Sequence, residues 1–399
     1  MTNSGSPPND SATDRSIDDP INEALRAVRD QLDFEVAFIS EFSSGQRCFR
    51  YVDSSPDFAP CHVGDSDALE NSLCSMVADG RLPELLPDAS SDPVALEVEA
   101  TRSLPVGAHI SVPIRIDGEL FGTFCCFSRE GDAALDERDL GVVRGYARLA
   151  ERLLSRAIRA RRGQELRRRQ IRDVLEQRRF APVFQPIFRL APLELVGYEA
   201  LTRFVAEPPR PADQWFNEAA AIGLHVELEI AALRRALDEF GRLPTDSYLS
   251  LNLSPKTIVD EGLRDALDGV PLDRVVLELT EHTSTGDYGG IAARLRDLRA
   301  RGLRLAVDDA GAGYSSLRHF LRLEPEIIKL DASLVAAIDR SAKLRAMTTA
   351  MLAFARETGS VVVAEGVEHE QELQTLRELG VVFAQGYLLG RPAPLPDVT

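Results

Sequence analysis

The segment from Leu303 to Asp331, LRLAVDDAGAGYSSLRHFLRLEPEIIKLD, is the feature that most limits the fold. It predicts a buried strand that ends in the carboxylates of Asp308 and Asp309, then a glycine-containing loop, a short helix and a second strand that ends in Lys329 and Asp331. Two like charges at a strand end repel each other unless a cation or water separates them. A pair of Asp residues is a common bridge between two divalent metals. An ordinary helix N-terminus, capped by Asp and Ser, is the alternative, and this segment alone does not decide between them.

The same pattern recurs through the second half of the chain, where short apolar runs that end in an acid or amide are separated by helical stretches. The runs, with their polar residues, are 195–203 with Glu199, 249–254 with Asn252, 275–281 with Glu278 and Glu281, 360–368 with Glu365 and Glu368, and 381–386 with Gln385. Alternating strands and helices predict a β/α architecture. Active sites of β/α barrels lie at the C-terminal ends of the strands, so we expect these side chains to form one site. Residues 181–190 and 193–203 are predicted to be two consecutive antiparallel strands at its start.

Length and charge narrow the class of protein. The chain of 399 residues predicts two or three domains, and its net charge of −17 makes DNA and RNA polymers unfavourable general partners. A small anionic substrate is compatible with this charge if metals and arginines line its pocket. No apolar run approaches 18 residues, which predicts no membrane segment. Residues 1–20 are polar, lack the pattern of a signal peptide and are expected to be disordered, so a cytoplasmic location is predicted.

The first third predicts a mixed α+β domain. A helix is expected at 21–34, strands at 36–42 and 48–52, and a hairpin of 109–116 and 120–128 joined by Asp117-Gly118, followed by a long helix. This order, and the stretch IRIDGELFGTFCCFS, resembles a GAF domain over residues 21–155. The resemblance implies a small-molecule sensor but leaves its ligand unknown. Many such domains bind cyclic nucleotides, haem, iron or tetrapyrroles, and others only dimerise.

The cysteines do not predict a disulfide framework, because their number is odd and their spacing is unpaired. They are Cys48, Cys61, Cys74, Cys125 and Cys126. The adjacent Cys61-His62 is interpreted as a loop thiol beside a surface imidazole rather than a cofactor anchor, since one adjacent pair fixes no ligand geometry. Cys125 and Cys126 lie in an apolar strand, where at least one should be a buried small hydrophobe. His109 is predicted to be a strand-edge residue rather than a ligand.

Residues 136–179 are predicted to form one long connecting helix. An apolar seam at spacings of three and four is typical of a helix with a parallel partner and favours a homodimer. Its members are Leu140, Val143, Ala147, Ala150, Leu154 and Ile158. The later turns are rich in arginine, which fits a solvated linker or, more specifically, a signalling helix that couples sensor to output. A DNA-binding role is disfavoured because no zipper or helix-turn-helix frames these residues.

The second half resembles the EAL-domain cyclic di-GMP phosphodiesterases. Glu199-Ala200-Leu201-Thr202-Arg203 matches the EALxR signature of that family. Seven further motifs follow the family's pattern: Gln185-Pro186-Ile187, Asn252-Leu253-Ser254, Glu278-Leu279-Thr280-Glu281, Asp308-Asp309, Lys329-Leu330-Asp331, Glu365-Gly366-Val367-Glu368 and Gln385-Gly386-Tyr387. The resemblance covers about residues 170–395 and implies a domain at 180–399. It implies a modified (β/α)₈, TIM-like barrel with one antiparallel strand, the second, that hydrolyses cyclic di-GMP to pGpG using two Mg²⁺ or Mn²⁺ ions.

The resemblance also assigns a role to each matching residue. One metal ion would be held by Glu199, Asn252, Glu278 and Asp308, and the other by Asp308, Asp309 and Glu365. Lys329 and Gln385 would act at the water between them, Glu365 would share in catalysis, and Glu281 would brace the loop after Asp309. The substrate would be contacted by Gln185, Leu201, Arg203 and Asp331. Glu281, Glu368 and Asp331 have an alternative as surface acids. A buried Glu199 is harder to explain without a cation, because a bare buried carboxylate is unfavourable.

One position departs from the family pattern. Ala310 follows the Asp pair where the family usually has Phe, which removes an aromatic from a loop that links the active site to the dimer interface in that family. The metal ligands are untouched, so the expected activity is that of a GAF-regulated phosphodiesterase. The alternatives are a receptor that binds cyclic di-GMP without cutting it and a scaffold that signals through dimerisation. The sequence contains no GGDEF-type stretch, so synthesis of cyclic di-GMP is not expected.

Overall fold

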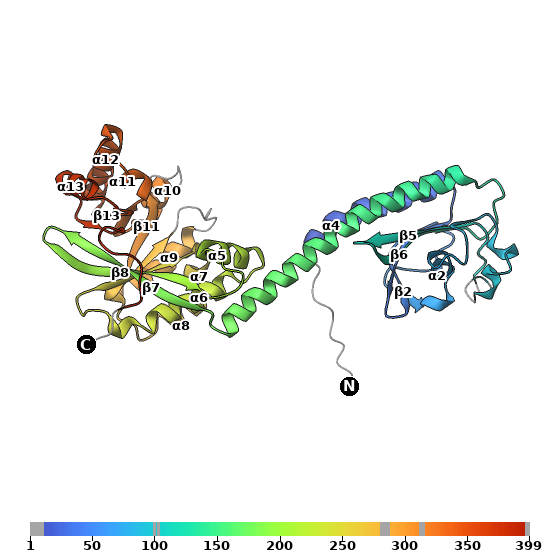
Figure 1. The fold of residues 1–399 in the computed structure, drawn as a ribbon, viewed down its shortest axis with the longest axis horizontal. Coiled ribbons are helices and arrows are strands. Elements are labelled where there is room, and N and C mark those ends of the chain that lie inside the picture. The colour runs from blue at the N-terminus through green and yellow to red at the C-terminus, as the bar shows by residue number, and fades with distance from the viewer. Residues whose placement is uncertain (1–11, 99–100, 102–103, 280–287, 311–315, 396–399) are drawn as a thin grey trace. The chain divides into compact units, whose positions relative to one another are not determined.

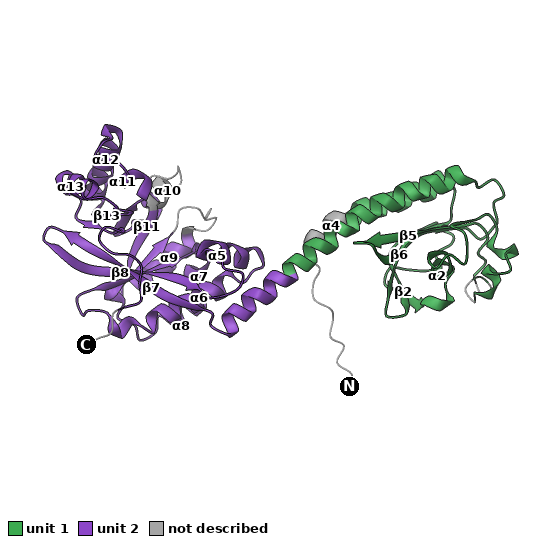
Figure 2. Ribbon diagram, viewed as in Figure 1, with its two compact units in different colours: residues 1–164 green, residues 165–399 purple. Residues whose placement is uncertain are grey.

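The computed structural model describes residues 12–98, 101, 104–279, 288–310 and 316–395. The chain divides into two compact units, residues 1–164 and 165–399 (Figure 2). Within the described part of the chain, no helix has both the length and the apolar character needed to cross a membrane.

The first unit is built on a six-stranded antiparallel sheet in the order β3-β2-β1-β6-β5-β4. Its strands are β1 (Val36–Ser43), β2 (Gln46–Ser54), β3 (Ser66–Ala68), β4 (Leu85–Leu86), β5 (His109–Ile116) and β6 (Glu119–Phe127). Helices α1 (Ala12–Gln31) and α4 (Glu137–Glu176) pack on one face, and α2 (Leu73–Ala78) packs on the other (Figure 1). Successive residues of a strand point to opposite faces, so Cys126 enters the core beneath α1 and α4 while Cys125 enters the core beneath α2.

Helix α1 begins earlier than the sequence predicted. Residues 12–20 were expected to be disordered, but they continue the helix that was predicted at 21–34. Its Asp18 carboxylate accepts a hydrogen bond from the Tyr51 hydroxyl of β2 at 3.0 Å. Tertiary contact with the sheet thus supports a turn of helix whose polar sequence does not favour folding by itself. Residues 1–11 lie outside the described part.

The apolar seam of α4 does not face a partner helix, and its interpretation as a dimer interface was wrong. Leu140, Val143, Ala147, Ala150 and Leu154 are buried against the sheet and α1. A three–four spacing marks a helix with one apolar face but does not name what covers that face. The predicted homodimer therefore stays a prediction without this support.

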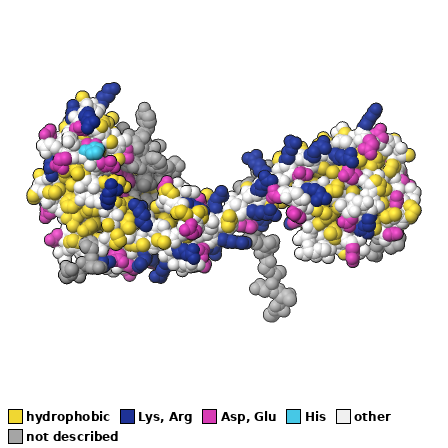
Figure 3. Space-filling view, in the orientation of Figure 1, with side chains coloured by type: hydrophobic (Ala, Val, Ile, Leu, Met, Phe, Trp, Pro, Cys, Tyr) yellow, Lys and Arg dark blue, Asp and Glu magenta, His cyan; other side chains and the backbone are white. Residues whose placement is uncertain are grey.

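The later turns of α4 present arginines to solvent, and Figure 3 shows basic side chains gathered over this helix. The exposed residues are Arg156, Arg159, Arg161, Arg162, Arg167, Arg168, Arg169 and Arg172. Two of them turn back on their own unit, since Arg159 donates to Asp117 at 3.0 Å and Arg162 lies 3.6 Å from the same carboxylate. This is the solvated helix face that the sequence predicted.

Two residues of the first unit lie deeper than expected. His109 was predicted at a strand edge, but it is only 3% exposed, because β5 is covered on both sides by β4 and β6. Cys61 is also buried, whereas His62 beside it is exposed. Cys125 and Cys126 are both fully buried, which confirms the expectation that at least one fills the core.

The second unit contains a closed eight-stranded barrel in the order β10-β11-β12-β13-β14-β7-β8-β9 (Figure 1). Its strands are β7 (Phe180–Leu190), β8 (Leu193–Phe204), β9 (Tyr248–Leu253), β10 (Val275–Leu279), β11 (Arg304–Ala310), β12 (Ile327–Leu330), β13 (Val361–Ala364) and β14 (Phe383–Ala384). β7 pairs antiparallel with both β8 and β14, and the other pairs are parallel. One strand is antiparallel, as expected, but it is the first strand of the barrel and not the second.

Helices follow the strands of this barrel as the alternating pattern predicted. They are α5 (Ala212–Ala221), α6 (His225–Leu237), α7 (Pro255–Val259), α8 (Glu261–Ala266), α9 (Tyr288–Arg299), α10 (Ser316–Leu323), α11 (Ala332–Val335), α12 (Ala342–Thr358) and α13 (Glu370–Leu379). Strands β10 and β12 each contain a single polar residue, because strand residues here face either the barrel interior or these helices. Polar side chains inside the barrel are therefore unusual and mark its site.

Candidate functional site

The site is a polar layer that lies directly above an apolar layer in the barrel. Ile187, Val276, Ala306, Ile327 and Val363 form one buried cluster, with Phe383 packed against it. Side chains two residues apart on a strand share a face. The polar residues two positions further on are Glu278, Asp308, Lys329, Glu365 and Gln385. Each parallel strand thus continues from an apolar side chain to a polar one at its C-terminal end.

The antiparallel strand β7 contributes to the same layer in the opposite sense. Because β7 runs the other way, its polar residue Gln185 comes two residues before Ile187 instead of after it. Gln185 pairs across the sheet with Glu199 of β8, which brings a further carboxylate into the layer. Sequence motifs that are far apart in the chain therefore meet at one end of the barrel.

Lys329 occupies the centre of four carboxylates and is only 2% exposed. Its Nζ lies 2.5 Å from Glu278 Oε2 and 2.6 Å from Glu365 Oε1. It also lies 3.3 Å from Glu199 Oε2 and 3.6 Å from Asp308 Oδ1. One ammonium can neutralise only one of four carboxylates, so this buried layer carries an excess of acidic groups.

The pKa values reflect this excess. Burial raises the pKa of Glu278 to about 8, and the neighbouring Glu199 carboxylate adds to the rise while Lys329 opposes it. Burial also raises the pKa of Glu365 well above its usual value. Burial acts in the same direction on Glu199, but Lys329 and the amides of Gln385 and Asn252 outweigh it and lower the pKa of Glu199. Burial disfavours the charged form of Lys329, yet its carboxylate neighbours, Glu199 first, raise the pKa of Lys329 well above its usual value.

Amide and hydroxyl groups orient the carboxylates. Asn252 Nδ2 donates to Glu199 Oε1 at 2.8 Å, and Gln385 Nε2 donates to Glu199 Oε2 at 2.6 Å and to Glu365 Oε1 at 2.9 Å. Ser250 Oγ donates to Glu278 Oε1 at 2.5 Å. Ser250 was not expected in the site, although it lies on the polar face of its strand, two residues before Asn252. Gln385 Oε1 is buried and has no hydrogen-bond partner among the described residues.

A cleft of about 340 Å³ opens above this layer. Of the residues predicted to contact substrate, Gln185 and Leu201 line the cleft, and Glu368 and Tyr387 line it as well. Gln185 is held by donating to the Gly390 carbonyl at 3.1 Å. The cleft is thus bordered by residues within β7 and β8 and by residues that end or follow β11, β12, β13 and β14.

Two predicted substrate contacts lie differently. Arg203 is exposed near the end of β8 and does not line the cleft, although it shares a strand face with Leu201 and Glu199. Asp331 caps helix α11 by accepting from the Ser333 backbone amide at 2.9 Å. The structure thus gives Asp331 a capping role of its own.

Part of the predicted site lies outside what the structure describes. Glu281 falls in residues 280–287, and the loop after Ala310 falls in 311–315. Asp309 and Ala310 belong to β11, where the Ala310 backbone pairs with Leu330, but their side chains are not described. The roles predicted for Glu281 and Asp309 therefore stay predictions.

Comparison with protein families identifies both units. A model of the EAL domain matches residues 168–392, and a model of the GAF domain matches residues 14–155. The EAL match alone spans more than half of the chain, and it contains every residue of the polar layer described above.

Curated proteins from two bacteria are similar in sequence to parts of this chain. A signalling protein of Caulobacter vibrioides, whose function is uncharacterised, is 31% identical over 353 residues, which are 84% of this chain and 40% of that protein. A protein of Pseudomonas aeruginosa named cyclic di-GMP phosphodiesterase NbdA is 34% identical over 256 residues, which are 60% of this chain and 32% of that protein. The chain thus spans less than half the length of these two relatives.

Solved structures resemble the barrel unit. A structure described as the PaMucR phosphodiesterase in complex with c-di-GMP is 29% identical, with a TM-score of 0.51, and covers 57% of this chain and 98% of that one. The YkuI protein of Bacillus subtilis, described with an EAL domain, substrate c-di-GMP and calcium, is 26% identical, with a TM-score of 0.50 over 57% of this chain and 60% of that one. On the family match and the barrel geometry together, this chain belongs to the EAL-domain family and carries a GAF domain before its barrel.

Proposed function

We propose that the barrel hydrolyses cyclic di-GMP to linear pGpG with the assistance of two Mg²⁺ or Mn²⁺ ions. The observation that carries the proposal is the layer of four carboxylates around Lys329 beneath an open cleft. Relatives of the same family support the substrate, since one is named a cyclic di-GMP phosphodiesterase and two similar structures are described as c-di-GMP complexes.

The residues of the layer fit divalent cations. Oxygen ligands of this kind suit hard cations such as Mg²⁺ and Mn²⁺. The raised pKa values of Glu278 and Glu365 mean that the layer holds more carboxylates than Lys329 can balance. Gln385 Oε1, buried without a partner among the described residues, is a further oxygen that a bound group or its water would satisfy. These features are unfavourable in an empty protein core and favourable around cations.

In this proposal the ligands divide between two ions. Glu199, Asn252, Glu278 and Asp308 would hold one, and Asp308, Asp309 and Glu365 would hold the other. Two bound cations would supply Lewis-acid stabilisation of the phosphate charge and activation of the attacking water.

The chain's own residues perform the remaining tasks. Lys329, which lies between carboxylates within or just after four strands, would orient a water and stabilise negative charge on the phosphate. Gln385 donates to both Glu199 and Glu365, so it holds these two carboxylates in a fixed relation. Gln185 and Leu201 line the cleft, where they would contact the nucleotide, and the exposed Arg203 would reach a phosphate with its planar guanidinium.

Control by the GAF domain is also part of the proposal. It is supported by α4, a single helix from Glu137 to Glu176 that begins in the first unit and ends in the second. A continuous helix transmits rotation or bending from one unit to the next, because its backbone hydrogen bonds resist local distortion.

The test is hydrolysis of cyclic di-GMP by the purified full chain with Mg²⁺ or Mn²⁺, with pGpG measured by chromatography. Glu199→Ala should lower the rate by more than about 100-fold, because even outer-shell partners of metal ligands contribute 10–100-fold. Glu357→Ala, a change of an exposed carboxylate in α12, is the matched control and should leave the rate unchanged. Tight binding of cyclic di-GMP without product would instead establish a receptor. The absence of both binding and product would contradict the proposal.

A further inference from the structure

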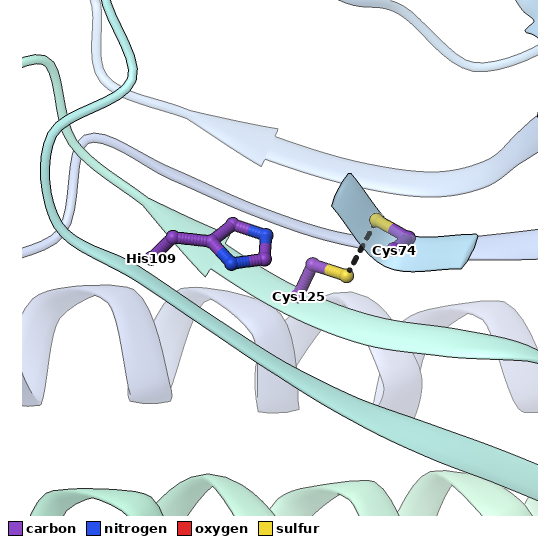
Figure 4. Close-up of side chains that lie close together, drawn as sticks. All are labelled: Cys74, His109 and Cys125. Atoms are coloured by element: carbon purple, nitrogen blue, oxygen red, sulfur yellow. Dashed lines mark hydrogen bonds between the residues drawn. The ribbon is translucent and has the colours of Figure 1, made fainter. Parts of the chain in front are cut away.

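A second buried cluster lies in the GAF domain. Cys74 of α2, His109 at the start of β5 and Cys125 of β6 meet in the core beneath α2, and they are 1%, 3% and 0% exposed. One ligand atom from each residue lies within 4.8 Å of the other two. Figure 4 shows the imidazole of His109 directed toward the two sulfur atoms. These three side chains are therefore close enough to share one metal ion.

The distances suit a tetrahedral site after a small adjustment. Cys74 Sγ and Cys125 Sγ are 3.1 Å apart. With metal–sulfur bonds of about 2.3 Å, tetrahedral geometry places two sulfurs about 3.8 Å apart, so a side-chain shift below about 1 Å opens the site. Two thiolates and a neutral imidazole also balance the charge of one divalent ion, so a loaded site places no net charge in the apolar core.

The surroundings of the cluster resemble the outer contacts of a metal–thiolate site. Arg47 Nη1 donates to Cys74 Sγ at 3.4 Å, and Cys125 Sγ lies 3.1 Å from both Ser111 Oγ and Thr123 Oγ1. The Ser111 hydroxyl can rotate to donate to a thiolate, whereas Thr123 Oγ1 accepts from the Cys125 thiol. Donors of this kind orient ligands and tune their basicity. Buried thiols that serve only as small hydrophobes do not need them.

His109 supplies an independent observation. Its Nδ1 atom is buried and has no hydrogen-bond partner among the described residues. A buried polar atom without a partner is unfavourable, and such atoms in native proteins often mark an absent water. In Figure 4 the other ring nitrogen, Nε2, is the one directed at the sulfurs, so Nε2 would bind the ion and Nδ1 would be left for a water. The ring also lines a small cavity of about 50 Å³, together with Cys74, Cys61 and Arg47. This cavity has room for a water or another small ligand next to the three ligand residues.

We propose that Cys74, His109 and Cys125 of the GAF domain bind one thiophilic transition-metal ion, of which Zn²⁺ is the simplest, with a fourth position open to the neighbouring cavity. Sulfur and imidazole ligands select such ions and disfavour Mg²⁺. Three protein ligands with an open position are the arrangement of zinc sites that take a water or an exogenous ligand. The alternative is a redox pair in which Cys74 and Cys125 form a disulfide, and His109, aimed at both sulfurs, has no role in that reading.

The test is a Co²⁺ titration of the full chain in its reduced form, followed by absorption spectroscopy. A thiolate bound to Co²⁺ produces a ligand-to-metal charge-transfer band, which the oxygen and nitrogen ligands of the barrel layer cannot produce. We expect one such site per chain, competed by Zn²⁺. Cys74→Ser and His109→Gln should each weaken Co²⁺ binding more than about tenfold, since losing a ligand costs at least as much as losing an outer-shell partner.

Cys126→Ala is the matched control. Cys126 is equally buried and adjacent to Cys125, but it faces the opposite core, so this variant should keep the full band. His109→Gln keeps both sulfurs, and near-ultraviolet circular dichroism will show whether each variant retains its packed core. Cys61→Ser tests the open position: an unchanged band supports it, and a weakened band would make Cys61 the fourth ligand.

Two outcomes would overturn the proposal. The first is the absence of a sulfur charge-transfer band in the wild-type chain, or an equal band in folded Cys74→Ser and His109→Gln. The second is an intact mass two hydrogens lower after mild treatment with hydrogen peroxide, mapped to Cys74 and Cys125, in a chain that binds no Co²⁺ when reduced. That result would assign the two sulfurs to a redox pair, with peroxide reduced to water as the disulfide forms.

Discussion

The two units each bury a cluster of ionisable side chains, but the clusters differ in chemistry and in setting. In the barrel, four carboxylates surround the Lys329 ammonium beneath a cleft of about 340 Å³. In the GAF domain, two sulfurs and an imidazole meet beside a cavity of about 50 Å³. Oxygen ligands select hard cations and sulfur ligands select softer ones. Under the two proposals, the chain would bind two classes of metal ion at two separate sites, one open to a nucleotide and one only to a small ligand.

The clusters also differ in how they remain stable without a metal. Lys329 provides an internal cation for the barrel layer, so the carboxylates are partly balanced at all times. In the sulfur cluster, the Cys125 thiol and Arg47 lower the pKa of Cys74 well below its usual value, and Arg47 is also paired with Asp67 at 2.9 Å. The free energy of unfolding of the barrel unit should therefore depend strongly on the charges in its cluster. That of the GAF unit should depend more on which metal ion is present.

The largest expected effect comes from removing the internal cation. Lys329→Met leaves four carboxylates in the barrel without an ammonium, and breaking a buried ionic arrangement typically costs about 3–5 kcal/mol. We expect the barrel unit of this variant to unfold at lower urea concentration in the presence of a chelator, and we expect Mn²⁺ to restore part of the loss. Hydrolysis of cyclic di-GMP should be lost in either condition.

Lys343→Met is the control for that variant, because Lys343 is exposed on α12. A surface change of this kind should stay within about 0.5 kcal/mol. Equal stability of Lys329→Met and wild type in chelator would show that protonation of the carboxylates replaces the ammonium without loss. The contrast between the two clusters would then be wrong.

A second effect follows from pH. The folded pKa of Glu278, raised to about 8, lies above its ordinary value of 4.5, so the folded state binds more protons between these values than the unfolded state. The stabilisation from this group is complete below pH 4.5 and is lost as pH rises toward about 8. The free energy of unfolding of the metal-free barrel should fall with a slope of up to about 1.4 kcal/mol per pH unit from this group.

Urea unfolding in chelator across this range will measure the slope. Glu278→Gln should flatten it, because glutamine has no proton to lose, and saturating Mn²⁺ should flatten it in the wild type. A wild-type slope equal to that of Glu278→Gln would mean that Glu278 remains ionised and is fully balanced by Lys329.

The third effect separates the clusters by cation class and rests on the proposed GAF site. A metal present at 100 times its dissociation constant stabilises the folded state by about 2.7 kcal/mol. Zn²⁺ should increase the free energy of unfolding of the GAF unit by this amount in wild type but not in Cys74→Ser. Mg²⁺ should leave the free energy of unfolding of this unit unchanged. Calorimetry with the two transitions resolved is the measurement. A GAF transition that responds to Mg²⁺, or to Zn²⁺ in Cys74→Ser, would contradict the division by ligand chemistry.

The smallest effect concerns a hydroxyl that braces the barrel layer. Ser250→Ala removes the hydrogen bond to Glu278, which should weaken Mn²⁺ activation of hydrolysis by about tenfold, the lower end for an outer-shell partner. Ser254→Ala, near the end of the same strand, removes a hydroxyl that donates to Glu229 at 2.8 Å and should leave the Mn²⁺ requirement unchanged. Similar Mn²⁺ activation curves for both variants would show that Ser250 does not orient Glu278.

Much of the barrel site was predictable from the chain alone. Period-two alternation places Glu278, Asp308, Lys329 and Glu365 on one face of their strands, and the alternation of strands and helices brings parallel strand ends together. The direction of each strand and its register with its neighbours were harder to predict from the sequence. Nothing local shows that β7 is the antiparallel strand of the closed barrel, or that Ser250 lies opposite Glu278 at hydrogen-bonding distance.

In the GAF domain the sequence predicted the main helices and strands, and the tertiary structure showed which contacts their buried faces make. The spacing of Leu140 to Leu154 predicts an apolar helix face, but only the fold shows that the domain's own sheet covers it. Cys74 and Cys125 are 51 residues apart, on a helix and a strand of different local periods, so no motif relates them. Because successive residues of β6 face opposite sides of the sheet, Cys125 and not Cys126 meets Cys74 and His109. Local periodicity specifies which face of an element is buried, whereas contacts between distant elements depend on how the whole chain packs.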